Sequence, residues 1–174
     1  IHERLVGSEM CIRDRAYADH WFNGKPEDEK IYIMLGEGVG GAYINASAIR
    51  NGVHNRGGEF GHMVIHPGGK QCLCGKKGCF EAYVSEKVLS SELDMTLDNF
   101  FELAAQGNKN NSNVLDEYMD NLALGINNIY TMMDCDIVLG GTVAPYLKQY
   151  DNSIKERLVN DYSFDTDADY LRIS

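Results

Sequence analysis

Three cysteines that fall within eight residues of one another constrain this 174-residue chain more than any other feature of its sequence. They are Cys72, Cys74 and Cys79. Thiolates are among the ligands that zinc prefers, and four thiolate or imidazole ligands close a tetrahedral shell. Without a recognisable secretory signal, such a cluster suits a metal site better than a disulfide framework. The spacing therefore predicts a loop folded around one structural metal ion.

Two histidines are candidates for the fourth ligand. His62 stands ten residues before Cys72 and His66 stands six residues before it, and spacing alone does not choose between them. Glycines in the same loop allow the backbone to bend sharply around a small ion, and lysines there can offset the charge of the thiolates. The glycines are Gly68, Gly69, Gly75 and Gly78, and the lysines are Lys70, Lys76 and Lys77.

The composition is that of a globular protein with an acidic surface. Apolar residues make up 44% of the chain, charged residues make up 24%, and the formal net charge is −10. Basic surfaces bind phosphate backbones, so this charge argues against direct binding of nucleic acid by the chain. No run of 18 apolar residues is present, so no segment is expected to span a membrane. We expect a cytoplasmic protein that handles a small neutral molecule.

The first fifteen residues differ in character from the rest of the chain. Residues 6–15 have the sequence VGSEMCIRDR, which resembles the translated end of a transposon adapter used to prepare DNA sequencing libraries. Processing scars of this kind are excluded when a fold is inferred. We therefore expect residues 1–15 to be a sequencing-adapter artefact and the biological sequence to begin near residue 16.

Hydrophobic patterning predicts strands that alternate with helices, an order that indicates an α/β domain. Short apolar runs predict strands, and apolar residues at three- and four-residue steps predict helices, most strongly over residues 113–133. The expected strands cover residues 31–35, 42–44, 48–50, 63–65, 136–139 and 170–173. The expected helices cover residues 16–22 (a helix end), 80–89, 97–105 with Thr96 as N-cap, 113–133 and 145–158, with an exposed loop at 107–113.

The residues around the cysteines resemble the signature of the ROK family of bacterial repressors and sugar kinases. That signature is G-E-x-G-H, nine arbitrary residues, then C-x-C-G-x-x-G-C-x-E, and residues 58–81 contain every fixed position of it. Residues 35–42 are similar to the family's LGTGVGGG segment, and residues 137–141 are similar to its late strand and glycine pair. The resemblance extends over nearly all of residues 16–174, and its central motif is highly specific.

The resemblance implies a fold. The family has the two-lobed actin-like ATPase (ribonuclease H-like) fold, and this chain would be mainly the C-terminal lobe with an inserted zinc loop. We expect residues 16–174 to be a sugar-binding lobe that is truncated at both ends. The family's Asn-Asp pair, whose Asp is the catalytic base of the kinases, has no counterpart here, so no catalytic residue is assigned.

The resemblance also implies the residues of the site. It selects His62 over His66, so that the zinc ligands are His62, Cys72, Cys74 and Cys79. It assigns sugar hydroxyls to Glu59, His62 and Glu81. Carboxylates accept hydrogen bonds from neighbouring hydroxyls and can select stereochemistry, and a zinc-bound His62 can offer its second ring nitrogen to a hydroxyl. Asn45 and Arg50 are weaker candidates near the same strands.

A nucleotide site is implied only if the chain is part of a kinase, with ATP and Mg²⁺ as cofactors. Its residues would be Gly36, Gly38, Gly40, Gly140 and Gly141. Two differences from the kinase pattern weaken such a site. Glu37 stands where a Thr usually donates to phosphate, and an ionised carboxylate repels a polyphosphate. Ala42 adds a Cβ where the family usually has glycine.

These differences favour a sugar-sensing transcriptional regulator, of which this chain is the effector-binding region with one structural zinc. The alternative is an ATP-dependent hexose kinase of the glucokinase or N-acetylmannosamine kinase type. The implied partners are a small-molecule sugar and further copies of the chain, and DNA only through a helix-turn-helix that this sequence does not contain. A zinc-stabilised interaction domain without a ligand is a third interpretation.

Overall fold

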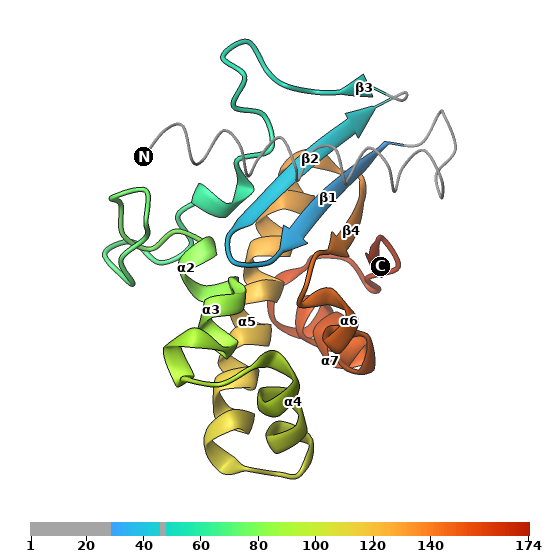
Figure 1. Ribbon diagram of the computed structural model, residues 1–174. Coiled ribbons are helices and arrows are strands. Elements are labelled where there is room, and N and C mark those ends of the chain that lie inside the picture. The colour runs from blue at the N-terminus through green and yellow to red at the C-terminus, as the bar shows by residue number, and fades with distance from the viewer. Residues whose placement is uncertain (1–28, 46–47) are drawn as a thin grey trace.

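The computed structural model describes residues 29–45 and 48–174. The adapter-like residues 1–15 and the helix end predicted over residues 16–22 lie outside the described residues, and both stay predictions. Within the described residues, a mixed sheet and a layer of helices form one α/β unit (Figure 1).

The sheet has five strands and mixed direction. The strands span Lys30–Leu35 (β1), Val39–Asn45 (β2), Ala48–Ile49 (β3), Asp136–Gly140 (β4) and Leu171–Ile173 (β5). Their order is β3-β2-β1-β4-β5. β1 pairs antiparallel with β2 and parallel with β4, while β3 is antiparallel to β2 and β5 is parallel to β4. Since β1 and β4 are parallel neighbours, the turns that follow them lie side by side at the carboxyl ends of the two strands. This end of the sheet is called the carboxyl edge below.

Apolar residues on both faces explain why β1 lies in the middle of the sheet. Ile31, Ile33 and Leu35 are fully buried in the main core, whereas Tyr32 belongs to a second, smaller cluster with Val138. Successive strand residues point to opposite faces, so a continuous apolar run is typical of a strand that is buried on both sides. The strands predicted over residues 31–35 and 136–139 are confirmed.

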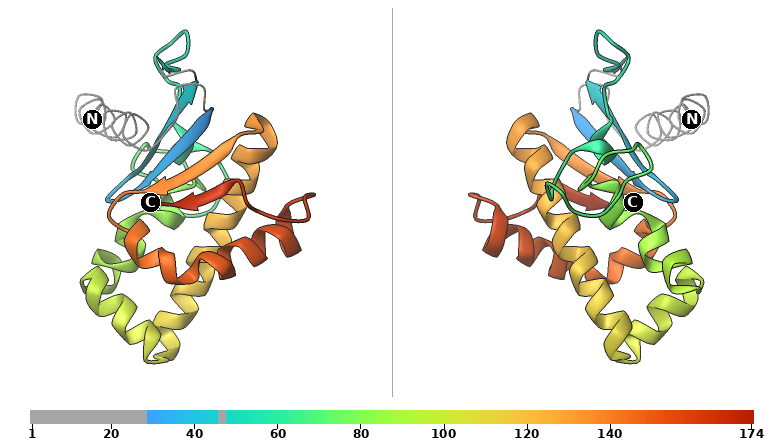
Figure 2. Two further views of the ribbon diagram at one scale, coloured as in Figure 1. Left: turned by 90° about the vertical axis from the view of Figure 1, so that its right-hand side faces the viewer. Right: turned by 90° about the vertical axis from the view of Figure 1, so that its left-hand side faces the viewer.

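Helices cover one face of the sheet (Figure 2). They span Glu81–Val84 (α2), Glu86–Leu89 (α3), Leu97–Ala105 (α4), Lys109–Met133 (α5), Ala144–Leu147 (α6) and Asp151–Arg157 (α7). Short 3₁₀ segments span Phe60–His62 (η1), Ser91–Leu93 (η2) and Lys148–Tyr150 (η3), and a π-helical turn spans Leu158–Tyr162 (η4). In the part of the chain that the structure describes, no helix combines the length and the apolar character needed to cross a bilayer.

The long helix α5 begins earlier than its apolar pattern predicts. The side chain of Asn108 accepts hydrogen bonds from the backbone N–H groups of Asn110 and Asn111, which makes it an N-cap. The exposed loop predicted over residues 107–113 is therefore wrong from residue 109 onward. The helices predicted over residues 113–133 and 97–105 are confirmed, and Thr96 caps α4 as expected.

Two predicted helices are broken. The helix predicted over residues 80–89 is divided into α2 and α3 by Ser85, whose backbone is extended. The hydroxyl of Tyr118 donates to the Val84 carbonyl at 2.8 Å, so the carbonyl at this break has a buried partner. The helix predicted over residues 145–158 is likewise divided into α6, η3 and α7.

The strand predicted over residues 63–65 is wrong. Only an isolated bridge between Val64 and Cys79 forms there. The backbone N–H groups of Ile65 and His66 both donate to the Gly78 carbonyl, so the chain bends around Gly78 instead of pairing along a strand. This bend brings the segment that contains His62 next to the cysteines.

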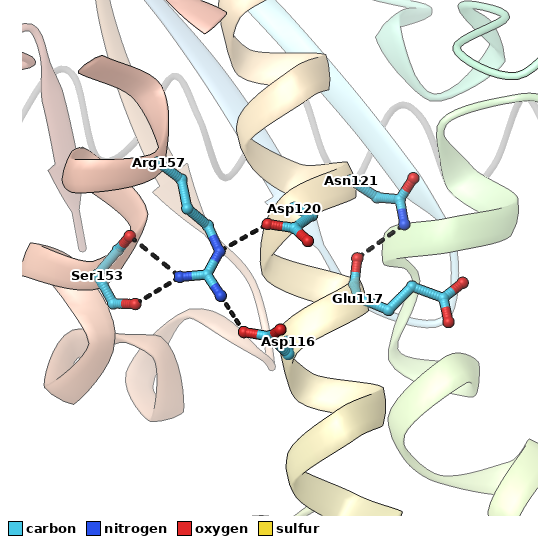
Figure 3. Close-up of polar contacts among 6 residues, drawn as sticks. All are labelled: Asp116, Glu117, Asp120, Asn121, Ser153 and Arg157. Atoms are coloured by element: carbon cyan, nitrogen blue, oxygen red, sulfur yellow. Dashed lines mark hydrogen bonds and ion pairs between the residues drawn. The ribbon is translucent and has the colours of Figure 1, made fainter. Parts of the chain in front are cut away.

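An arginine fastens the helix α7 to α5 (Figure 3). The guanidinium of Arg157 donates to the carboxylates of Asp116 and Asp120 on α5, with a 2.7 Å contact to Asp120, and also contacts Ser153 one turn earlier. The arginine side chain is only 18% exposed, while the two carboxylates are half-exposed or more. The link holds the C-terminal helices against the same long helix that supports the cysteine loop.

Candidate functional site

The structure brings four predicted ligands together. The ligand atoms of His62, Cys72, Cys74 and Cys79 all lie within 4.8 Å of one another. Cys74 Sγ is 3.7 Å from Cys79 Sγ, and Cys72 Sγ is 3.9 Å from His62 Nδ1. Metal–sulfur bonds of about 2.3 Å in a tetrahedron place two sulfurs about 3.8 Å apart. These spacings are therefore those of a cluster that could hold one tetrahedral metal ion.

The cysteine loop, residues 67–79, is shaped by backbone hydrogen bonds. The Cys72 N–H donates to the Lys76 carbonyl at 2.8 Å, and the Gly78 N–H donates to the Lys70 carbonyl at 2.8 Å. Gly78 has a φ of 82°, and a Cβ there would lie 1.7 Å from the His66 carbonyl oxygen. No other residue fits at that position, because only glycine combines a positive φ with so close an approach.

Tyr83 of α2 anchors the loop to the helical layer. Its hydroxyl accepts a hydrogen bond from the Lys70 backbone N–H at 2.8 Å, and its ring packs edge-on against His66. His66 itself points away from the cluster, because its Nε2 donates to the side-chain oxygen Oδ1 of Asn121 at 2.6 Å. The geometry therefore selects His62, not His66, as the fourth member of the cluster.

Burial alone would keep two of the three thiols protonated. It raises the pKa of Cys72 to about 12, and it also raises the pKa of Cys79. Burial acts in the same direction on Cys74, but hydrogen bonds from the Lys76 backbone N–H and from the neighbouring thiols outweigh it and lower the Cys74 pKa. A bound cation favours the thiolate form of all three, because the thiolate is the species that coordinates metal.

Two of the three predicted sugar ligands line one pocket. Glu59 and His62 lie on the rim of a pocket of about 350 Å³ whose wall is apolar. The wall residues are Phe60, Met63, Ile129, Met132 and Met133. His62 Nε2 is 3.9 Å from a Glu59 carboxylate oxygen, while Nδ1 of the same ring faces Cys72. The imidazole thus presents one nitrogen to the cysteines and the other to the pocket.

Glu81, the third predicted sugar ligand, lies beside the metal cluster and faces the turn after β1. One carboxylate oxygen accepts a hydrogen bond from the Val39 backbone N–H at 2.9 Å, and the other lies 3.6 Å from Cys72 Sγ. A Cβ at Gly38 would approach this carboxylate to 2.9 Å. Glu81 is thus in contact with both the cysteines and the glycine turn, and it is absent from the pocket that Glu59 and His62 line.

The weaker sugar candidates lie at the other end of the hairpin. Asn45 ends β2, where it pairs with Ala48, and Arg50 follows β3 and is exposed. The structure thus places them on the β2–β3 side of the sheet, at the opposite end of β2 from the turn that Glu81 contacts.

The two glycine motifs meet at the carboxyl ends of β1 and β4. The Val143 N–H donates to the Leu35 carbonyl at 3.2 Å, and a Cβ on Gly36 would lie 3.6 Å from the Thr142 hydroxyl. Gly141 has a φ of 96° and packs against the Leu35 backbone. A cavity of about 290 Å³, which Gly140 and Gly141 help to line, extends along the same edge.

Of the predicted nucleotide glycines, Gly38 lies in the turn before β2 and Gly40 lies on β2 itself. Gly40 pairs with Met34 inside the sheet, whereas Glu37 is exposed at the tip of the turn. Ala42 lies opposite Tyr32 and is buried in the smaller apolar cluster. The Ala42 Cβ therefore packs in the smaller apolar cluster. This position does not support the expectation that the Cβ weakens a nucleotide site.

Two residues of this region carried no signal in the sequence. Glu86 and Thr142 are 56 positions apart, yet the Thr142 hydroxyl donates to the Glu86 carboxylate at 2.5 Å. Each residue lies close to a motif that the sequence did reveal. Glu86 follows Glu81 by five positions, and Thr142 directly follows the glycine pair at residues 140–141. That adjacency is the only local pattern that could have indicated them.

Comparisons with known proteins agree with these motifs. A model of the ROK family matches residues 6–171. The chain is 31% identical over 130 residues to the xylose repressor of Bacillus subtilis, across 71% of this chain and 34% of the repressor. It is 25% identical over 183 residues to the glucokinase of Thermotoga maritima, across 90% of this chain and 58% of the glucokinase.

A solved structure supports the fold. The ROK family glucokinase from Streptomyces griseus, crystallised with glucose and AMPPNP, is 23% identical to the chain with a TM-score of 0.68, across 86% of this chain and 53% of that chain. The chain spans less than two thirds of each of these three proteins. The predicted α/β lobe of the actin-like type is confirmed. Since the family model matches most of its residues, this chain belongs to the ROK family.

Proposed function

We propose that this chain binds a sugar at the pocket lined by Glu59 and His62. The observation that carries the proposal is that a carboxylate and an imidazole nitrogen, 3.9 Å apart, share the rim of one pocket beside the metal cluster. Vicinal hydroxyls present donors and acceptors at a similar spacing, and carboxylates are good acceptors for them. The pocket volume of about 350 Å³ suits a small ligand. Glu81 does not line this pocket, and its two carboxylate oxygens contact Val39 and Cys72, so the proposed sugar contacts are those of Glu59 and His62.

We further propose that the metal is zinc and that its role is structural. Three thiolates and one imidazole are soft and borderline ligands of the kind zinc prefers, and the set leaves no coordination position open. When bound, zinc would supply a fixed anchor, with His62, Cys72, Cys74 and Cys79 as its ligands. The His62 ring would then be held in a single orientation, with Nε2 available to a sugar hydroxyl.

The favoured function of the whole protein is sugar-responsive regulation of transcription. Glu37 supports this proposal, because an exposed carboxylate at the tip of the first glycine turn opposes binding of a polyphosphate. In this proposal the protein acts in the cytoplasm as a homo-oligomer. It would contact DNA through a helix-turn-helix in another part of the full-length protein, since a net charge of −10 on these 174 residues is unfavourable for direct contact with phosphates.

The alternative is an ATP-dependent sugar kinase. It is favoured by one observation: the predicted nucleotide glycines Gly36 and Gly141 come together at the carboxyl ends of two parallel strands. Open α/β sheets commonly bind ligands at that edge. The relatives of the chain include glucokinases, which are kinases, and xylose repressors, which are regulators, so both proposals have a precedent among them.

The deciding experiment is titration calorimetry of the full-length protein with a panel of aldoses that includes xylose and glucose, followed by a coupled assay for ADP release. We expect one sugar to bind with no release of ADP, and Glu59→Gln to weaken that binding by about tenfold or more. Glu102→Gln, an exposed charge change on α4, is the matched control. Sugar-dependent ADP release would replace the regulator with the kinase. Unchanged binding by Glu59→Gln would remove this pocket from the sugar site.

A further inference from the structure

Glu86 connects the two glycine motifs. Its backbone N–H donates to the Gly36 carbonyl at 2.7 Å, in the turn after β1. Its carboxylate accepts the Thr142 hydroxyl at 2.5 Å, and Thr142 directly follows the glycine pair after β4. One residue therefore bonds both turns at the edge of the sheet where the parallel strands β1 and β4 end.

Three donors beside the glycine turns have protein acceptors. The Val39 N–H donates to the Glu81 carboxylate, and the Val143 N–H donates to the Leu35 carbonyl. The Thr142 hydroxyl is taken by Glu86. Glycine-rich turns hold phosphates through such N–H and hydroxyl groups, so these turns keep their shape with a carboxylate in the place of an external anion.

The charge at this edge acts in the same direction. Glu37 is exposed at the tip of the turn after β1, and the carboxylate of Glu86 reaches across to Thr142. Glu81, which accepts from the Val39 N–H beside Gly38, adds a third carboxylate, and like charges near one set of glycines repel a polyphosphate. Of the three, only Glu86 occupies a side-chain donor of the glycine motifs, which makes it the more specific obstacle.

We propose that Glu86 determines ligand specificity at this edge: it excludes polyphosphates by its charge and by occupying the Thr142 hydroxyl. The inference extends the proposed function from what the chain binds to what it rejects. A chain that holds its glycine turns with an internal carboxylate has no need of a nucleotide to order them. The sugar pocket stays independent, because its residues Glu59 and His62 do not line this edge.

The test is binding of MgATP to the full-length protein, measured by calorimetry for the wild type, Glu86→Gln and Glu86→Asp. We expect Glu86→Gln, which removes the charge but keeps the size, to bind MgATP about tenfold more tightly or better. Glu86→Asp keeps the charge and should stay near the wild type. Glu86→Ala removes the acceptor as well as the charge, whereas the amide oxygen of Glu86→Gln still accepts the Thr142 hydroxyl, so Glu86→Ala should gain at least as much as Glu86→Gln. Adding Thr142→Val to Glu86→Ala should reverse the part of the gain that comes from the released hydroxyl. Glu102→Gln controls for net charge, and thermal melts confirm that each variant is folded.

Two outcomes overturn the inference. One is an affinity for MgATP, tight or weak, that Glu86→Gln leaves unchanged, and the other is an equal gain in Glu86→Asp and Glu86→Gln. Sugar titrated into the same samples tests the proposed function separately. Sugar binding without an effect of Glu86→Gln on MgATP would leave the proposed function in place and remove Glu86. Loss of all sugar binding with a clear effect of Glu86→Gln would do the opposite.

Discussion

The cysteine loop and the sheet–helix core reach an ordered structure by different means. In the core, side chains such as Ile31, Leu122 and Ile137 are fully buried, and apolar burial accounts for the packing. In the loop, Leu73 is 75% exposed and Lys76 and Lys77 are exposed as well, so little apolar surface is removed from water. The loop instead depends on a few backbone hydrogen bonds and on four ligand atoms gathered within 4.8 Å.

The two regions join at Phe80. This residue directly follows Cys79, is fully buried, and packs over Gly125 of the long helix. The cysteine loop, which is ordered by a few separate contacts, is therefore joined to the closely packed core by the residue that follows Cys79. Removing one ligand atom from the loop and one ring from the core should therefore have separable effects on metal content and on the free energy of unfolding.

The largest effect is expected from Cys79→Ser. Removing one of four ligands should lower the bound metal from one equivalent to nearly none, because apparent zinc affinities of such sites are on the order of 10 kcal/mol or more and depend on every ligand. Elemental analysis gives the metal content, and limited proteolysis reports the order of the loop. Cys135→Ser is the control, since Cys135 lies outside the cluster. Retention of one equivalent by Cys79→Ser would show that Cys79 is not a ligand.

Phe80→Ala should destabilise the core by about 3–5 kcal/mol, the usual range for deletion of a buried aromatic ring. Urea denaturation at a fixed metal concentration measures the free energy of unfolding. Phe164→Ala provides the control, because that ring is 78% exposed and its loss should stay within about 0.5 kcal/mol. A small effect of Phe80→Ala would mean that the loop and the core are joined elsewhere.

Gly125→Ala should destabilise by about 1–2 kcal/mol, although alanine is the better helix former. A Cβ at this position would lie 2.2 Å from the Phe80 ring, and overpacking outweighs the gain in helix propensity of about 1 kcal/mol. The exposed substitution Asn113→Ala on the same helix should stabilise instead. Denaturation of both variants tests the sign, and a stabilising Gly125→Ala would show that Phe80 moves aside freely.

The smallest effect is expected from Arg157→Gln, about 1 kcal/mol or less. Its partners Asp116 and Asp120 are 63% and 50% exposed, so solvent and salt screen the ion pairs. The effect should shrink further when thermal unfolding is measured at high salt rather than low salt. Lys155→Gln, which removes a single pair with Asp151, should lie near the limit of detection. An effect of Arg157→Gln that persists at high salt would point to lost packing instead.

The core elements were predictable because burial leaves a periodic signal. The continuous apolar run of residues 31–35 indicates a strand buried on both faces, and the three- and four-residue steps in α5 indicate which side of the helix faces the core. The start of α5 was missed because residues 109–112 are polar, and the signal there is the cap Asn108, which is easily taken for part of a loop. The break at Ser85 depends on Tyr118, 33 positions away, which no local pattern reveals.

The site was predictable in part. The cysteines and His62 belong to one compact motif, and the structure brings them together as that motif implies. The direction of the Glu81 side chain was not predictable, because it depends on how the turn at Val39 approaches α2. The contact between Glu86 and Thr142 was likewise hidden, since it arises only when the sheet places two distant turns side by side.

The bend at Ser85 has a consequence for how such chains diverge. Glu81 lies before it and Glu86 after it, each in its own one-turn helix. The bend is held by the Tyr118 hydroxyl on the Val84 carbonyl, which neither glutamate supplies. Mutation can therefore replace the second glutamate while the geometry of the first is inherited unchanged. A substitution at position 86 should therefore alter the contact between the two glycine turns while Glu81 and the cysteine cluster stay in place.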